Sequence, residues 1–259
     1  MIGVVLDVGR RSLARFFELE GFDRSMALAG QAFAALLPLL IVLGSVSLAD
    51  DDDLADDLID RFDLSGSAAS TLRGAVAQPP DTGIGVLGLL LLIFSALSFT
   101  RALQRLYVRA WRLERLGVRG NVWGLAWLAM FVTFWSLQPA IVDLFDGVVG
   151  FAVSLGLSTL LWLLTPWLLV AKRVNWRRLL PQAFLTAVGI GAVTIGAAVY
   201  LPRAIASTSA QFGILGVGFT LLSLLFALSF VLIVTAALGA TLADTTEVDA
   251  DSGRITRRG

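Results

Sequence analysis

The sequence predicts an all-α fold, a polytopic membrane helix bundle of six transmembrane helices with amphipathic helices in the N-terminal arm and in a cytoplasmic loop. The first observation is composition, because 57% of the 259 residues are hydrophobic and only 15% are charged. Soluble domains average about 45–50% apolar and about 25% charged residues. The other two observations are a series of six long apolar segments and an uneven distribution of basic residues among the segments that connect them.

The six apolar segments are the expected membrane spans. A helix needs about 20 mostly apolar residues to cross the hydrocarbon core of a bilayer. The second segment is short, and the sixth is long enough for its glycine-rich start to form a separate bent piece. The segments cover roughly residues 25–48, 83–99, 122–142, 148–170, 179–201 and 214–242.

Basic residues set the expected orientation, because loops that stay in the cytoplasm carry an excess of Arg and Lys. Of the 20 basic residues, only Arg61, Arg73 and Arg203 fall on one side of the proposed map. Both ends of the chain share the other, richer side, which agrees with an even number of spans. We therefore expect a multi-pass protein of the bacterial inner (plasma) membrane with both termini in the cytoplasm. The richer side holds Arg10, Arg11, Arg15, Arg24, Arg101, Arg105, Arg109, Arg112, Arg115, Arg119, Lys172, Arg173, Arg177, Arg178, Arg254, Arg257 and Arg258.

The expected domain organisation is a single six-helix transmembrane domain over residues 1–243. Its first 24 residues carry Leu13, Phe16, Phe17 and Phe22 among charged residues. This pattern is typical of an amphipathic helix that lies on the inner leaflet. The polar segment 244–259 is expected to be a disordered cytoplasmic tail.

Cysteine and histidine are both absent. Their absence excludes disulfides and thiolate chemistry, and it removes the commonest general base and metal ligand. A glycine-rich phosphate loop followed by Lys is also missing from the sequence. We therefore expect no enzymatic activity, no catalytic residues, no cofactor and no metal site.

A dense acidic stretch, with eight Asp between residues 50 and 63, lies in the first external loop of the proposed map. One interpretation is a vestibule that collects cations or binds Ca²⁺, and the other is a solvated acidic surface. The spacing fails to match an EF-hand loop, because Ala55 and Arg61 stand where that loop needs Gly and Glu. We favour the solvated surface, which is the usual role of a charge block.

Polar and helix-breaking residues within the spans indicate where a transport path would lie, because polar groups inside a membrane are costly and usually functional. No ionisable residue sits clearly at the midpoint of a span, so a proton relay is not supported. Gln182 follows Pro181 at the start of the fifth span, and Asp143 is the best single ionisable candidate unless it is an interfacial carboxylate. The candidates for a path or a hinge are Gln31, Pro38, Gln138, Pro139, Asp143, Gln211, Gly213 and Gly216.

Four arginines after the second span follow a spacing of four, four and three residues: Arg101, Arg105, Arg109 and Arg112. This spacing puts them on one face of a helix that can lie at the inner membrane surface. A basic residue near an anionic leaflet contributes about 1 kcal/mol of attraction. We expect these arginines to contact anionic phospholipids, with a specific anionic ligand as the less favoured alternative.

Three motifs, taken in order, carry a resemblance to a known family. They are Ala35-Leu36-Leu37-Pro38-Leu39-Leu40 in the first span, Arg101-Ala102-Leu103-Gln104-Arg105-Leu106-Tyr107 after the second, and Phe212-Gly213 through Gly216 before a last helix that closes at Gly239-Ala240. In these motifs the chain resembles the YihY/virulence factor BrkB family, once labelled ribonuclease BN. The resemblance covers nearly the whole chain. It implies a six-helix inner-membrane protein of uncertain function, for whose relatives serum resistance and a transporter-like role have been proposed.

The chain departs from the family pattern at three places. Gln31-Ala32-Phe33 stands near the position of paired tyrosines, Leu215 replaces a Tyr, and Thr241 replaces a Glu. If those polar groups serve a shared activity, this chain has lost or changed it.

The sequence therefore favours a transporter-like permease of unknown substrate. The alternative is a non-transporting envelope scaffold or partner-binding membrane protein, which the scarcity of charge within the spans favours. Ribonuclease activity is not expected, because the chain lacks histidine and its dense carboxylate cluster maps outside the cell. The expected partners are the lipid bilayer and anionic phospholipids at the cytoplasmic face, with no nucleic acid. A homo-oligomer, protein partners, the coupling ion and the direction of transport all stay open.

Overall fold

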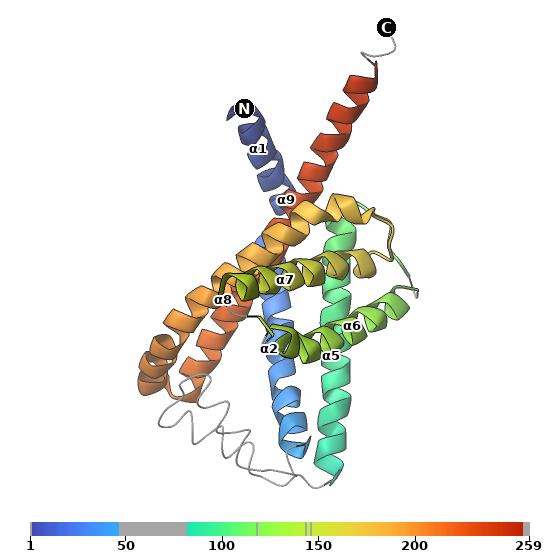
Figure 1. The fold of residues 1–259 in the computed structure, drawn as a ribbon. Helices are drawn as coiled ribbons and strands as arrows, with labels where there is room; N and C mark the ends of the chain where they lie inside the picture. The colour runs from blue at the N-terminus through green and yellow to red at the C-terminus, as the bar shows by residue number, and fades with distance from the viewer. Residues whose placement is uncertain (1, 47–81, 118, 143, 146, 256–259) are drawn as a thin grey trace. The chain divides into compact units, whose positions relative to one another are not determined.

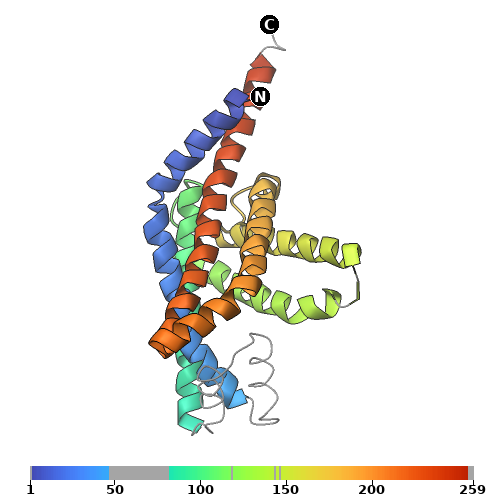
Figure 2. The same cartoon turned by 90° about the vertical axis from the view of Figure 1, so that its left-hand side faces the viewer.

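The structure is a computed structural model that describes residues 2–46, 82–117, 119–142, 144–145 and 147–255. These residues form seven α-helices, which are drawn in Figures 1 and 2. Within the described ranges, every regular element of secondary structure is an α-helix. The helices are α1 (Ile2–Glu18), α2 (Gly21–Val46), α5 (Thr82–Ala110), α6 (Arg119–Val142), α7 (Gly147–Leu169), α8 (Trp176–Phe212) and α9 (Ile214–Ile255).

Each of the six apolar segments expected from the sequence is helical where the structure describes it, and each lies within or nearly within one helix, α2 or α5 to α9. The amphipathic N-terminal arm is also confirmed as a helix, α1, which ends at Glu18. Glu20 then takes a left-handed backbone conformation with φ of 54°, and α2 starts at the next residue. The break between arm and first apolar helix is therefore a single tight turn.

Three helices extend further than the sequence predicted. The Arg101–Arg112 segment, expected as a separate helix on the membrane surface, is instead continuous with α5 up to Ala110. The segment after Phe99 is rich in Ala, Leu, Arg and Gln, which are strong helix formers, and it contains no Gly or Pro. The helix therefore continues past the end of the apolar segment. Likewise α8 continues to Phe212, and α9 continues to Ile255 through the segment expected to start a disordered tail at Asp244.

Five of the helices are long and apolar enough to cross a membrane: residues Leu87–Ala110, Gly120–Gln138, Gly147–Leu169, Trp176–Thr208 and Leu215–Thr245. The span expected in α2 is not among the five that the described residues support. The chain is thus a multi-span membrane protein by helix length and composition, and a count of six spans stays a proposal.

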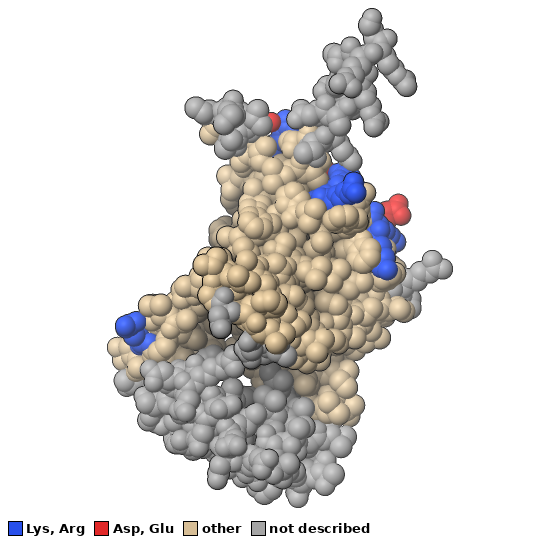
Figure 3. All heavy atoms as spheres, viewed as in Figure 1, with Lys and Arg blue, Asp and Glu red and all other residues tan. Residues whose placement is uncertain are grey.

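Apolar side chains cover much of the described surface. Phe94 in α5, Val148 in α7 and Phe219 in α9 are 70%, 85% and 67% exposed. The space-filling view in Figure 3 is correspondingly uncharged over most of the described surface, with basic side chains gathered in a few places. Exposed apolar surface on this scale is unusual for a protein in water, whereas lipid-facing helices require it.

The chain divides into two compact units. Unit 1 comprises Met1–Ser25, Thr100–Gly191 and Ser229–Gly259, and unit 2 comprises Met26–Phe99 and Ala192–Leu228. Every described basic residue that the sequence assigned to the cytoplasmic side belongs to unit 1, whereas Arg203 belongs to unit 2. The grouping by contacts therefore coincides with the grouping by charge.

Unit 1 contains α1, the paired helices α6 and α7, and parts of α2, α5, α8 and α9. Its core is made of fully buried apolar side chains from several helices. Their close packing holds the polar groups of this unit in fixed positions, because protein interiors are as dense as organic crystals. The core includes Leu103, Leu106, Leu169, Leu179 and Ile233.

Unit 2 contains parts of α2 and α5 and the turn between α8 and α9. Gly213 adopts φ of 59° there, and the amide of Gly216 donates a hydrogen bond to the carbonyl of Gly213 across 3.1 Å. Gly216 lies so close to the backbone carbonyl of Thr208 that a methyl group at Gly216 would overlap it. The hydroxyls of Thr208 and Thr220 are 3.1 Å apart, which joins the two helices beside the turn.

Candidate functional site

Within the described ranges, most buried polar side chains belong to unit 1, and one group of them lies where the basic end of α5 meets the start of α8 and the C-terminal half of α9. Gln182 of α8 is 1% exposed. Its Oε1 accepts a hydrogen bond from the indole Nε1 of Trp111, just after the end of α5, across 3.1 Å. The pair satisfies two buried polar groups that would each be costly if left alone.

A second polar contact follows one helical turn further along α8. The hydroxyl of Thr186 lies 2.8 Å from the hydroxyl of Thr235 in α9 and also 2.8 Å from the carbonyl of Gln182. Thr235 in turn donates to the carbonyl of Val231 across 2.8 Å. We call Tyr107, Trp111, Gln182, Thr186 and Thr235 the polar core.

Glycine makes the close approach of α8 and α9 possible. A methyl group at Gly239 would overlap the Cβ of Gln182, and one at Gly189 would lie 2.7 Å from a methyl carbon of Val231. Small residues of this kind let membrane helices come near enough for side chains to hydrogen-bond across the interface. The Gly239-Ala240 motif thus has a structural role beside Gln182.

Tyr107 is completely buried, and in the part of the chain that is described its hydroxyl has no hydrogen-bond partner. It lies one turn before Trp111, whose backbone amide donates to the carbonyl of Tyr107 across 3.0 Å. The hydroxyl of Ser12 in α1 is also buried and, among the described atoms, lacks a partner. Buried hydroxyls without partners are rare in proteins, so these two are candidates for contact with water or a ligand.

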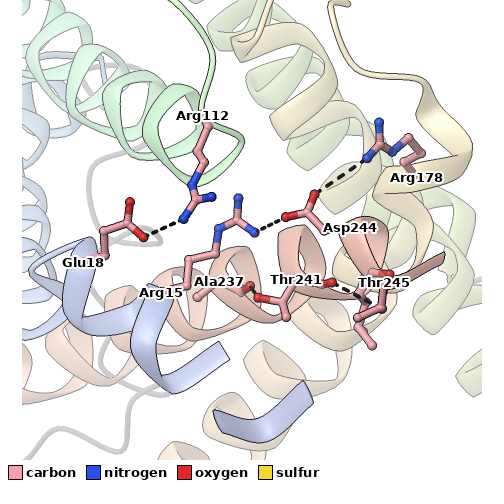
Figure 4. A network of polar contacts seen from close by, with 9 residues as sticks. Arg15, Glu18, Arg112, Arg178, Ala237, Thr241, Asp244 and Thr245 are labelled. Carbon is pink, nitrogen blue, oxygen red and sulfur yellow. Dashed lines mark hydrogen bonds and ion pairs between the residues drawn. The ribbon is translucent and has the colours of Figure 1, made fainter. Parts of the chain in front are cut away.

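Unit 1 also contains an ion-pair network, which is drawn in Figure 4. Nη1 of Arg15, a side chain that is 8% exposed, donates to Oδ2 of Asp244 across 2.7 Å, and Nη2 of Arg178 lies 3.9 Å from Oδ1 of the same carboxylate. Asp244 therefore faces guanidinium groups from both α1 and α8. The guanidinium of Arg178 also lies 5.9 Å from the ring of Trp111, which connects this network to the polar core.

The arginines that the sequence assigned to lipid contacts are all exposed. Two of them have protein partners: Arg112 pairs with Glu18 across 2.9 Å, and Arg109 lies 3.6 Å from Glu20. Figure 4 shows the Arg112–Glu18 pair beside Arg15. Arg101 and Arg105 stand nearer the middle of the same helix. Contact of these side chains with anionic lipid stays a prediction.

The motif from Arg101 to Tyr107 has a clear packing role. Leu103, Leu106 and Tyr107 are 1% exposed or less. Nε2 of Gln104 donates to the carbonyl of Gly120 at the start of α6 and to the carbonyl of Leu169 at the end of α7, across 3.2 and 3.0 Å. The motif therefore ties three helices together.

The candidates for a path or a hinge are spread over several helices. Gln31 and Pro38 lie in α2, Gln138 and Pro139 in the last turns of α6, and Gln211 at the exposed end of α8. Gly213 and Gly216 come together in the α8–α9 turn. Asp143 and the acidic stretch from residue 50 to residue 63 lie outside the described residues. Within the described ranges, the side-chain oxygen of Gln31 is buried and lacks a hydrogen-bond partner.

Sequence reasoning pointed to Gln182 as a polar residue at the start of a span, but it missed the interhelical contacts of this region. Trp111 is 71 positions away from Gln182, and Thr235 is 49 positions away from Thr186. The available signal for a buried polar site was the spacing of Gln182 and Thr186, because residues four apart share one helical face. Asp244 was missed because a polar chain end resembles a disordered tail.

Two of the three family departures lie in α9. Thr241 is buried one turn before Asp244, and its hydroxyl donates to the carbonyl of Ala237 across 2.9 Å. Leu215 is 67% exposed. The hydroxyl of Thr241 is therefore satisfied within α9.

Comparison with known proteins gave one match. No curated protein and no solved structure is significantly similar to this chain. The profile of one family, described as virulence factor BrkB, matches residues 12–257, a range that includes all three sequence motifs and every residue of the polar core and the ion-pair network. The chain belongs to the virulence factor BrkB family.

Proposed function

We propose that this protein is a transporter-like permease and that the polar core is part of its solute path. The observation that carries the proposal is the pair of buried side-chain contacts, Trp111–Gln182 and Thr186–Thr235, which lie among the buried apolar side chains of unit 1. Polar groups within membrane helices are rare and usually functional. The unpartnered hydroxyl of Tyr107 adds a group that a polar solute could satisfy.

Flux measurements test the proposal. Purified protein in sealed proteoliposomes would be tested with a panel of labelled ions, osmolytes, amino acids and organic anions. We expect at least one protein-dependent flux, and we expect Tyr107→Phe to reduce it at least tenfold, because only the unpartnered hydroxyl is removed. Ser136→Ala is a matched control, since Ser136 is an exposed side chain whose hydroxyl donates to the carbonyl of Val132 in its own helix. No flux over the whole panel would count against transport.

A second candidate is a non-transporting envelope scaffold, supported by the surface of α1. Leu6, Leu13 and Phe17 of α1 are 68%, 57% and 61% exposed, while Arg15 anchors the helix to α9. A partner helix could cover this apolar face. Crosslinking in cells from position 17 would capture one reproducible protein under this hypothesis, whereas the permease proposal expects lipid adducts.

We further propose six spans, with both termini on the cytoplasmic side of the plasma membrane. The concentration of Arg and Lys in unit 1 supports this orientation. Because the natural chain has no cysteine, single substitutions can report the side directly. Glu114→Cys should react with a membrane-impermeant maleimide only after the cells are opened, and Ser207→Cys should react in intact spheroplasts. The reverse pattern would invert the topology.

Catalysis is not part of the proposal, and ribonuclease activity in particular is not. The sequence has no histidine or cysteine to act as a general base or nucleophile. Incubation of the purified protein with structured and single-stranded RNA should leave both intact. RNA cleavage that co-purifies with the wild type and disappears in Tyr107→Phe or Asp244→Asn would overturn this statement.

A further inference from the structure

A small pocket opens where α7 ends and α8 begins. Its volume is about 200 Å³, and it is lined by Leu163, Leu164 and Trp167 of α7 and by Trp176, the first residue of α8. Drug-sized ligands usually occupy about 300–1,000 Å³. This pocket therefore has room for a segment of a hydrocarbon chain. The polar groups of its lining side chains are the two indole N–H groups.

Each tryptophan of the pocket carries a cation on its face. Nζ of Lys172 lies 4.6 Å from the ring centre of Trp167 and 5.2 Å from that of Trp123. The guanidinium carbon of Arg177 lies 5.4 Å from the ring centre of Trp176. Cation–π contacts of this kind hold the charged groups beside the rings. The two positive charges therefore flank an apolar opening.

The backbone fixes this arrangement. Ala171 and Lys172 adopt left-handed conformations with φ of 56° and 59°, and the amide of Lys172 donates to the carbonyl of Trp167 across 2.8 Å. This turn folds Lys172 back over the helix that precedes it. Nη1 of Arg173 donates to the carbonyl of Glu114 across 2.9 Å, which ties the turn to the segment after α5.

Neither Lys172 nor Arg177 forms an ion pair within the part of the chain that the structure describes. Among the described residues, no carboxylate lies within ion-pair distance of either side chain, and both side chains are exposed. Arg109 and Arg112, in contrast, face Glu20 and Glu18. Beside its apolar cavity the pocket thus offers a ligand two positive charges that have no acidic partner among the described residues.

We propose that this pocket binds an anionic phospholipid, with part of one acyl chain between Leu163 and Trp176 and the phosphate between Lys172 and Arg177. Charge complementarity favours a net negative headgroup over a zwitterionic one, because a choline group would bring a third positive charge to the site. Tryptophan and basic residues are the usual anchors at the level of the headgroups. The site is separate from the α5 arginines, and it does not depend on whether the protein transports a solute.

Fluorescence quenching tests the site in the intact protein. The full chain would be placed in nanodiscs of dioleoylphosphatidylcholine that contain a minor fraction of either phosphatidylglycerol or phosphatidylcholine with a brominated acyl chain. Bromine quenches tryptophan only at contact. We expect at least twofold more quenching by the brominated phosphatidylglycerol, and we expect the excess to disappear in the double variant Trp167→Phe/Trp176→Phe.

Charge variants separate this site from the rest of the basic surface. Lys172→Gln/Arg177→Gln should bring the quenching by phosphatidylglycerol down to that by phosphatidylcholine, whereas Arg101→Gln/Arg105→Gln should keep the excess. Arg177→Gln alone should remove about half of the excess quenching. This substitution is at an exposed position and preserves the turn at Lys172. Circular dichroism and size-exclusion profiles would confirm that each variant is folded.

Three results would overturn the proposal. One is equal quenching by the two brominated lipids in the wild type. The second is an excess that survives Lys172→Gln/Arg177→Gln or is lost with Arg101→Gln/Arg105→Gln. The third is full competition by millimolar inorganic phosphate in the surrounding buffer, which would identify a soluble anion as the occupant.

Discussion

Arg15 in the first helix and Asp244 in the last helix form an ion pair across 2.7 Å, although 229 positions separate them in the sequence. The arginine is 8% exposed and the carboxylate 52% exposed at the side chain. A second guanidinium, from Arg178, approaches the same carboxylate at 3.9 Å. The pair fastens the N-terminal arm to the far end of the chain (Figure 4).

Replacing Asp244 by Asn should loosen α1. The substitution leaves the buried guanidinium of Arg15 without its counter-charge, and breaking a buried pair in this way costs about 3–5 kcal/mol. Because Asp244 is half exposed, water offsets part of this loss, and we expect the attachment of α1 to weaken by about 1–2 kcal/mol. Limited trypsin digestion would measure the change as faster cleavage after Arg10 and Arg11. Glu18→Gln is the control, since the Glu18–Arg112 pair is exposed on both sides, and it should leave the cleavage rate nearly unchanged.

Replacing Gln182 by Leu should destabilise the polar core. The indole N–H of Trp111 then loses its acceptor in the interior, which costs about 1–3 kcal/mol. The midpoint of unfolding in mixed micelles of dodecyl maltoside and SDS would report the loss, and Gln211→Leu, at an exposed position, is the matched control. In the double variant Trp111→Phe/Gln182→Leu the two effects should not add, with a coupling of about 0.6 kcal/mol and at most about 1.7. Strict additivity would show that the two side chains do not interact.

Replacing Gly239 by Ala should separate α8 from α9. The added methyl group meets the Cβ of Gln182, which is attached directly to the helix backbone and cannot rotate away. Overpacking of this kind costs about 1–3 kcal/mol. The same micelle titration would measure it. Gly196→Ala, in α8 with open space around the added methyl group, should be neutral or slightly stabilising, and equal effects of the two changes would contradict the packing of α8 on α9.

Replacing Gly213 by Ala should strain the turn between α8 and α9. Gly213 has φ of 59° and no atoms near the position of an added methyl group, so the cost comes from the backbone alone. A left-handed conformation costs an L-residue about 1–2 kcal/mol. The unfolding midpoint should fall accordingly. Gly156→Ala, an ordinary helical glycine of α7 that is also surrounded by open space, should not lower it.

Most of the helices were predictable because a long apolar run in lipid has few alternatives to a helix. Their ends were less predictable. The extension of α5 to Ala110 depends on burial of Leu103, Leu106 and Tyr107 on one face, and burial depends on helices distant in sequence. The continuation of α9 past Asp244 has the same origin, since Arg15 gives that carboxylate a partner.

The candidate site was predictable only in part. Gln182 stood out as a polar residue in an apolar span, whereas Trp111 and Thr235 carried no mark that would pair them with Gln182 or Thr186. The pocket at Trp167 and Trp176 was not predicted at all. Its two walls come from different helices, and the cations that flank it are positioned by a turn whose left-handed residues, Ala171 and Lys172, are not glycines.

The sequence by itself determined that this is a helical membrane protein without histidine or cysteine chemistry, because hydropathy and composition are local properties of the chain. It also determined the clustering of Arg and Lys that distinguishes the two units. Tertiary structure decided which polar residues meet: Arg15 with Asp244, Trp111 with Gln182, and Lys172 with Trp167. Only these contacts show which polar groups are satisfied within the protein and which remain for a lipid or a solute, since a side chain's partners depend on helices that folding brings together.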